Sequence, residues 1–155
     1  MVSVNPYRYI IDTCAILSQK DLEPHRRKVY PSKWKRIDEL VRCQQIVTCS
    51  EIALEVQDPS IQEWMRQCPM LILPLDDEIQ ENVKKVLRIN TELVDFKTGK
   101  SSGDPFLIAT AMKYGLTVIT EEGKGSPKKI PFCCQKLGID CIDINMLCER
   151  EGWQF

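Results

Sequence analysis

Residues 7–17 read YRYIIDTCAIL, and the fold that we expect rests on this stretch. The run from Tyr7 to Ile11 is short, apolar and aromatic, and Pro6 and Asp12 bound it, which predicts a β-strand. Residues 13–18 are expected to form a short helix. The stretch therefore predicts a buried strand that ends in an acid and turns at once into a helix.

The same alternation of strands and helices continues along the chain. Further strands are expected at 45–49 (QIVTC), 70–73 (MLIL), 116–120 (LTVIT) and 139–144. Helices are expected at 31–43, 51–57, 61–67, 76–95, 104–114 and 132–137, with a last one ending near Glu151. This pattern predicts a parallel sheet covered by helices on both faces. We expect an α/β protein, a three-layer α/β/α sandwich with about five mainly parallel strands, as one domain over residues 1–155.

Length and composition agree with one soluble domain. The chain has 155 residues, of which 43% are hydrophobic and 28% charged, as in ordinary globular domains. No stretch approaches the roughly 18 apolar residues of a membrane span, and the first residues show no apolar signal-peptide core. We therefore expect a cytoplasmic protein without a membrane partner. The net charge of -1 excludes a basic coat over the whole surface for nucleic acid.

The cysteines are expected to be reduced and mostly buried, because nothing points to an oxidising compartment. No two of them have the short spacing of a zinc hook, so a zinc site is disfavoured. No thiol has an evident activating partner in the sequence, which disfavours a redox role. The eight cysteines are Cys14, Cys43, Cys49, Cys68, Cys133, Cys134, Cys141 and Cys148.

Acidic residues stand where the predicted strands end. They are Asp12 after the first strand, Glu51 and Glu55 after the second, and Glu121 and Glu122 after the fourth. The carboxyl ends of parallel strands meet at one edge of a sheet, so we expect these acids to converge there. Asp104 would join them if its helix begins beside the end of the first strand. Ser50 and Asp104 are also expected to be helix N-caps, with Pro105 in the first helical position.

Converging carboxylates repel one another and need a cation between them. Hard oxygen ligands suit Mg²⁺ or Mn²⁺, and such an ion supports attack of water on a phosphodiester. Singly, each acid has an ordinary explanation: Asp12 suits a turn, Asp104 suits a helix cap, and the glutamates suit solvated positions. As a set at strand ends, they favour a metal site.

Four motifs together resemble the PIN domain, the small metal-dependent ribonuclease fold of VapC-type toxins. They are IDTCAIL (11–17), SEIALEV (50–56), SGDPFLIATA (102–111) and LTVITEE (116–122), in the order and spacing of that family. The arrangement is similar to a prokaryotic PIN-like branch catalogued as a domain of unknown function. The resemblance implies that Asp12, Glu55, Asp104 and Glu122 hold the metal and are catalytic. It places Thr13, Ser102, Thr120 and Glu121 in supporting positions.

The resemblance also has one departure and several further implications. PIN domains usually carry Asp where Glu122 stands; Glu reaches one methylene further, so it would bind through water, or Glu121 would replace it. The family implies Mg²⁺ or Mn²⁺, an RNA substrate, a cognate antitoxin that occludes the site, and often a homodimer. The resulting expectation is the endoribonuclease toxin of a toxin–antitoxin pair.

Two basic segments offer contacts for the RNA backbone. Residues 20–42 carry eight basic and four acidic side chains, and residues 124–136 carry four lysines and no acid. His25 and Tyr30 could stack on unpaired bases, whereas Trp34 is expected to pack in the core. The expected RNA-binding residues are Arg26, Arg27, Lys28, Lys128 and Lys129.

Other functions remain open on the sequence. A catalytically decayed PIN-like module that binds a protein or RNA partner is compatible with Glu122, and a PIN nuclease acting on DNA fits the same acids. A phosphoaspartyl phosphatase would need an acid two residues after Asp12, where Cys14 stands. A P-loop protein would need glycine in residues 12–19, which have none. His25 is the one histidine, which argues against cleavage by a histidine pair.

Overall fold

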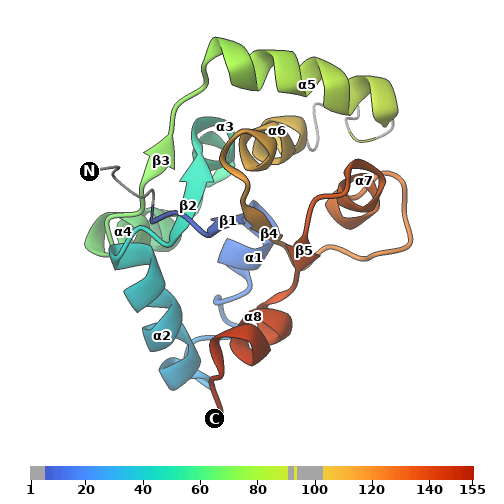
Figure 1. Cartoon of the computed structure of the whole chain (residues 1–155). Helices are drawn as coiled ribbons and strands as arrows, with labels where there is room; N and C mark the ends of the chain where they lie inside the picture. The colour runs from blue at the N-terminus through green and yellow to red at the C-terminus, as the bar shows by residue number, and fades with distance from the viewer. Residues whose placement is uncertain (1–5, 91–92, 94–102) are drawn as a thin grey trace, which may run out of the picture.

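Five short parallel strands form the centre of the protein in the computed structural model, which describes residues 6–90, 93 and 103–155 (Figure 1). The strand order across the sheet is β3-β2-β1-β4-β5, and every neighbouring pair is parallel. The expected α/β class is confirmed, and the sheet is parallel throughout the described strands. The strands are β1 (Tyr9–Ile11), β2 (Ile46–Cys49), β3 (Ile72–Leu73), β4 (Thr117–Ile119) and β5 (Cys141–Ile142).

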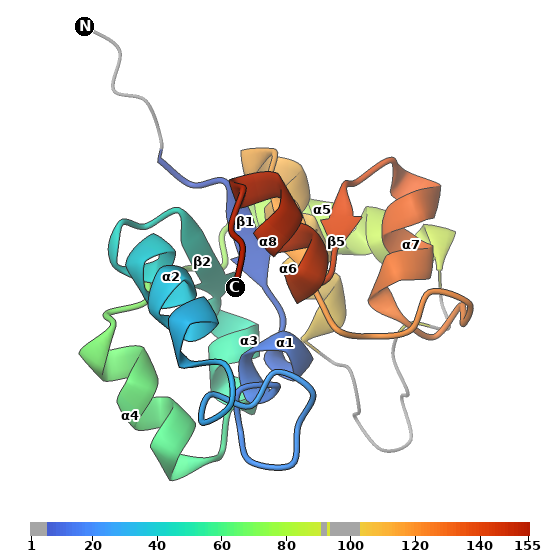
Figure 2. The same cartoon turned by 90° about the horizontal axis from the view of Figure 1, so that it is seen from below.

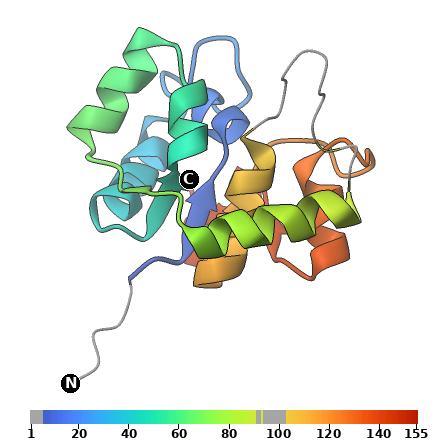
Figure 3. The same ribbon diagram turned by 90° about the horizontal axis from the view of Figure 1, so that it is seen from above.

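Helices cover both faces of this sheet. In Figure 1, α3, α5 and α6 lie above it and α1, α2 and α8 below it. Figure 3 shows α5 as the outermost helix of the upper layer, crossing α6. The helices are α1 (Thr13–Leu17), α2 (Pro31–Arg42), α3 (Ser50–Glu55), α4 (Pro59–Gln67), α5 (Asp77–Ile89), α6 (Asp104–Tyr114), α7 (Ile130–Leu137) and α8 (Ile144–Glu151). No helix in the described ranges is long and apolar enough to cross a bilayer.

The three inner strands, β2, β1 and β4, are mostly apolar because both of their faces are buried. Ile10 lies in register with Val47 on β2 and with Val118 on β4, and all three side chains are inaccessible to solvent. Each such side chain contributes about 1.5–3 kcal/mol of burial free energy. The rigid centre of the sheet therefore fixes the ends of β1 and β4 relative to each other.

Helix α6 lies between the sheet layer and α5, so most of its side chains are buried. Two alanines in its middle, Ala109 and Ala111, allow the close approach of neighbouring backbones. The Asn82 side chain of α5 donates a hydrogen bond of 3.2 Å to the Ala109 carbonyl oxygen. This packing fixes the start of α6, where Asp104 stands.

Both expected helix caps are wrong by one residue. Cys49 is the N-cap of α3, and Ser50 is already helical. Gly103 is the N-cap of α6, so Asp104 and Pro105 take the first two helical positions. The Gly103 carbonyl oxygen accepts the first helical hydrogen bond, from the Leu107 N–H at 3.0 Å, so Gly103 and not Asp104 is the cap.

Other helix boundaries differ modestly from the expected ones. Asp58 accepts hydrogen bonds from the N–H groups of Ser60 and Ile61, so α4 starts earlier than expected. Helix α5 ends at Ile89. The end of the longer helix expected there, most of the expected loop at 96–103, and Ser102 lie outside the described residues.

Candidate metal centre

Asp12 lies at the carboxyl end of β1, beside the end of β4. Its backbone N–H donates to the Ile119 carbonyl oxygen at 3.0 Å, and its side chain is buried, with 2% of the residue exposed. Its Oδ2 accepts a hydrogen bond of 2.8 Å from the Thr120 hydroxyl. Burial raises the pKa of Asp12, and hydrogen bonds from Cys14 and Thr120 oppose this rise.

Cys14 points into the same place from the first turn of α1. Its Sγ lies 2.8 Å from Asp12 Oδ2, to which it donates, and 3.3 Å from Thr120 Oγ1. The Glu121 N–H donates to this sulfur at 3.3 Å. Burial, followed by the charge of Asp12, raises the pKa of the Cys14 thiol. The sequence interpretation missed Cys14; its place two residues after a strand-end acid was the available signal.

Glu122 completes a compact group, which we call the Asp12 cluster: Asp12, Cys14 and Glu122. One ligand atom from each of the three residues lies within 4.8 Å of the other two. Glu122 Oε2 accepts a hydrogen bond of 2.8 Å from the Ile130 N–H at the start of α7. Burial raises the pKa of Glu122, and the nearby charge of Asp12 raises it further.

Glu55 reaches the site from the end of α3 and is held by two neighbouring segments. Its Oε2 accepts from the Thr13 hydroxyl at 2.9 Å, and its Oε1 accepts from the Gly103 N–H at 2.9 Å. The charge of Glu55 is among the causes that raise the pKa of Glu122, so the two carboxylates lie within electrostatic reach. Figure 2 shows α1 and α3 next to each other at this edge.

Asp104 follows Gly103 directly and is buried, with 3% of the residue exposed. The bond between Gly103 and Glu55 therefore places the start of α6 beside the end of α3. Within the described residues, the 4.8 Å group contains neither Glu55 nor Asp104. The structure thus brings Asp12 and Glu122 together most tightly and arranges Glu55 and Asp104 on the α3–α6 side.

Glu121 is directed away from the Asp12 cluster. Its carboxylate pairs with Nε2 of His25, whose Nδ1 lies 3.0 Å from Lys33 Nζ. Both His25 and Lys33 are buried, with 7% of each residue exposed. The expectation that His25 stacks on bases is therefore wrong. Of the two neighbouring glutamates, Glu122 is the one beside Asp12, because the pairing with His25 draws Glu121 toward the segment before α2.

One of the expected RNA-binding residues has a structural role. The Arg27 guanidinium donates to both carboxylate oxygens of Asp38 at 2.9 Å and lies over the rings of Trp34 and Trp64. Trp34 is completely buried, as expected for a core residue. The Arg26 Nε donates to the Glu23 carbonyl oxygen, which leaves other donors of that side chain available.

Three other expected RNA-binding residues are lysines on the surface. Lys28, Lys128 and Lys129 are exposed. The charge of Lys129 lowers the pKa of Glu122, which opposes the effect of burial and shows that this lysine is near the Asp12 cluster. An RNA-binding role for these lysines remains a prediction.

The five-stranded parallel sheet with its acidic edge is a PIN-like fold, and solved structures share it. FitAcB from Neisseria gonorrhoeae superposes with a TM-score of 0.57 and 17% identity, over 88% of this chain and 97% of that chain. PAE2754 from Pyrobaculum aerophilum superposes with a TM-score of 0.53 and 14% identity, over 94% of this chain and 89% of that chain. FitAB bound to the IR36 DNA fragment superposes with a TM-score of 0.53 and 17% identity, over 88% of this chain and 94% of that chain.

Sequence comparison assigns the family. Residues 9–155 match the family described as "Domain of unknown function (DUF4411)", and the chain belongs to that family. A search of the curated proteins found no match. The family assignment agrees with the sequence interpretation of a PIN-like branch of unknown function.

Proposed function

We propose that this protein is a metal-dependent endoribonuclease that hydrolyses RNA phosphodiester bonds with Mg²⁺ or Mn²⁺. Asp12, Glu55, Asp104 and Glu122 would hold the ion at the carboxyl edge of the sheet. The observation that carries the proposal is the meeting of Asp12 and Glu122 within the 4.8 Å group. The two acids follow neighbouring parallel strands, and their side chains converge at the carboxyl edge of the sheet, where an ion would offset their repulsion.

The residues present fit a divalent cation. Two carboxylates that are buried or half-buried lie close together, and burial and mutual repulsion raise the pKa of Glu122. A cation between them would remove this repulsion, and carboxylate oxygens are the ligands that Mg²⁺ and Mn²⁺ prefer. A bound ion would supply positive charge to stabilise the phosphate and to lower the pKa of water.

The surrounding hydrogen bonds assign a task to each side chain. Thr120 and Cys14 orient Asp12, and the Ile130 N–H orients Glu122. Thr13 and Gly103 fix both oxygens of Glu55, which lies just outside the Asp12 cluster. We propose that Glu55, held in this way, binds the ion from the α3–α6 side, and that a neighbouring carboxylate of the site accepts the proton that water gives up when it attacks phosphorus in line.

The substrate and partners follow from charge and fold. Lys128 and Lys129 are exposed, and Lys129 is near enough to Glu122 to lower its pKa, so we expect both lysines to bind the phosphates that flank the cleaved bond. The PIN-like fold supports a role as the toxin of a toxin–antitoxin pair, in which a cognate antitoxin covers the acidic edge. A homodimer is part of the same proposal.

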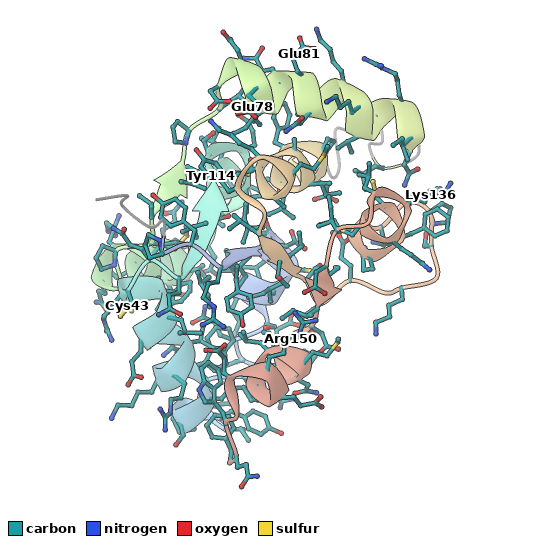
Figure 4. The ribbon with its side chains drawn as sticks, in the orientation of Figure 1. Cys43, Glu78, Glu81, Tyr114, Lys136 and Arg150 are labelled. Carbon is teal, nitrogen blue, oxygen red and sulfur yellow. The ribbon has the colours of Figure 1, made fainter. Side chains whose placement is uncertain are left out.

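The decisive experiment is an RNA cleavage assay with Mg²⁺, with Mn²⁺ and with excess chelator. Asp12→Asn removes the charge but retains an oxygen that can accept from Thr120 and Cys14. Glu81→Gln is the matched control, because Glu81 lies on the outer side of α5 (Figure 4) and is exposed. We expect cleavage that requires metal, disappears in Asp12→Asn and persists in Glu81→Gln.

Other outcomes would change the proposal. Cleavage that survives in Asp12→Asn would place the activity elsewhere or in a contaminant. DNA cleaved in preference to RNA would make the protein a DNA-directed nuclease with the same site. Without any cleavage, and without stabilisation by Mn²⁺ in thermal unfolding, the protein would be a decayed module that binds a partner.

A further inference from the structure

A sulfur atom lies among the oxygen ligands of the proposed metal site. Cys14 Sγ belongs to the 4.8 Å group with one oxygen each of Asp12 and Glu122. Mg²⁺ is a hard cation that binds oxygen, whereas thiolates bind softer ions such as Zn²⁺. A cysteine in this position would therefore add softer divalent ions to those that the site can bind.

The donor atoms lie close enough to share an ion after a small movement. Zinc binds sulfur at about 2.3 Å and carboxylate oxygen at about 2.0–2.2 Å, so two such ligands on one tetrahedral ion are about 3.6 Å apart. The separation between Cys14 Sγ and Asp12 Oδ2 is 2.8 Å. Small side-chain rotations would open this pair around an ion, and the Glu122 oxygen is close enough to join it.

Neighbouring groups fix the position of the sulfur. The Glu121 N–H donates to Cys14 Sγ at 3.3 Å, and Thr120 Oγ1 lies 3.3 Å from the sulfur while its own proton is donated to Asp12. These contacts hold the sulfur beside the oxygens with which it would share an ion.

We propose that Cys14 is a direct metal ligand, and that the Asp12 cluster binds thiophilic divalent ions such as Zn²⁺ and Co²⁺ through its sulfur. The inference rests on the metal site of the proposed function, but it concerns ligation and is measurable without RNA. On binding, the S–H bond is replaced by a sulfur–metal bond and the proton passes to solvent. The Asp12 oxygen that accepted the hydrogen bond from this S–H group would then face the ion.

A comparison of the affinities of the wild type for different metal ions does not by itself test the proposal. Most sites with nitrogen, oxygen or sulfur ligands bind Co²⁺ and Zn²⁺ more tightly than Mn²⁺. The discriminating comparison is therefore between variants of one side chain. Cys14→Ser retains a hydroxyl that can donate to Asp12 but removes the sulfur. Cys43→Ser is the matched control, because Cys43 is exposed at the end of α2 (Figure 4).

The experiment titrates Co²⁺ into the full chain and follows the thiolate-to-cobalt charge-transfer absorption in the near ultraviolet. We expect this band in the wild type and in Cys43→Ser, with one equivalent bound. We expect Cys14→Ser to lose the band and to bind Co²⁺ and Zn²⁺ about 10- to 100-fold more weakly. Its affinity for Mn²⁺ should change much less. Cys14→Ala provides a second variant if the serine variant does not fold.

Two results would overturn the inference. One is Co²⁺ binding, measured by calorimetry, without a charge-transfer band in the wild type or with a band that persists in Cys14→Ser. The other is the absence of Co²⁺ binding. Neither result decides the proposed function, because cleavage of RNA with Mg²⁺ or Mn²⁺ is measured separately and does not require the sulfur as a ligand.

Discussion

The backbone N–H of Gly103 donates to Glu55 Oε1 at 2.9 Å, and this bond ties the start of α6 to the end of α3. A Cβ atom at position 103 would lie 2.4 Å from that oxygen. The φ angle of Gly103 is -79°, which any residue can adopt, so the requirement for glycine is the close approach. The oxygen is at the end of a flexible side chain, and the carboxylate would yield before the backbone.

Gly103→Ala is expected to displace Glu55 and to reduce RNA cleavage at least about tenfold, because a carboxylate misplaced by about 1 Å loses its catalytic position. The free energy of unfolding should fall by about 1–3 kcal/mol at most. Cleavage kinetics and thermal unfolding measure the two effects. Gly125→Ala is the control, since a Cβ there meets nothing within 4 Å. Wild-type activity in Gly103→Ala would remove Glu55 from the mechanism.

The pKa values of Asp12 and Glu122 predict a pH-dependent stability without metal. Burial raises the pKa of both residues in the folded state. Their stabilising contribution is thus present below the unfolded pKa values of about 4 and is lost as the pH rises through the folded values. With chelator present, the wild type should lose stability relative to Asp12→Asn and Glu122→Gln as the pH rises above about 4.

Added Mn²⁺ should make the wild type more stable than both variants near neutral pH. Only the wild type retains both charges that the ion neutralises. Melting temperatures of the three proteins across the pH range, with chelator and with Mn²⁺, provide the measurement. Identical pH profiles for wild type and variants would show that folding does not raise the pKa of either carboxyl group.

Thr120 connects the two acids of the Asp12 cluster. Its hydroxyl donates to Asp12 Oδ2 at 2.8 Å and accepts from the Glu122 N–H at 3.2 Å. We expect Thr120→Val to weaken Mn²⁺ binding about 10- to 100-fold and to cost about 1–3 kcal/mol of stability. Thr117→Val, on the same strand, removes a hydroxyl that bonds Asp140 and should leave metal binding unchanged. Equal calorimetric affinities for the two variants would contradict a positioning role.

The lysines before α7 are expected to bind the RNA backbone. Replacing Lys128 and Lys129 with Ala should weaken binding of single-stranded RNA and lower the salt slope by about 0.7 for each phosphate that is no longer neutralised. The control replaces Lys84 and Lys85 with Ala. These lysines are exposed on α5, so the control makes the same change of charge away from the site. Binding measured at several salt concentrations tests this. An unchanged slope for the first pair would place the RNA footprint elsewhere.

We expect Arg27 to stabilise the fold, whereas Arg26 and Lys28 are expected to contribute to RNA binding. Arg27→Ala removes the two hydrogen bonds to Asp38 and the stacking on the Trp34 ring. Because the Arg27 side chain is 35% exposed, we expect a moderate cost of about 1–3 kcal/mol. Arg26→Ala should cost less than about 0.5 kcal/mol. Chemical denaturation of both variants checks this, and equal stabilities would contradict the structural role of Arg27.

The α/β class, the places of the strands and the acids at their ends could all be predicted from the amino-acid sequence. Local patterns carry this information: the apolar run before Asp12 predicts a buried strand, and the later repeats of strand and helix predict a parallel sheet. The convergence of Asp12 and Glu122 also followed, because the carboxyl ends of parallel strands share one edge. Helix caps were less predictable, since a cap depends on one backbone hydrogen bond, as between the Leu107 N–H and the Gly103 carbonyl oxygen.

Which side chains share that edge depends on tertiary packing. Glu121 and Glu122 are adjacent and chemically identical, and the partners that separate them, His25 and Ile130, come from other segments. Cys14 had no visible partner in the sequence because Thr120 and the Glu121 N–H reach it across the sheet edge. Apart from the bond between Glu122 and Ile130, these interactions join residues far apart in the chain, so no local pattern encodes them. The packing of β1 against β4 brings Cys14 to Thr120 and Glu121.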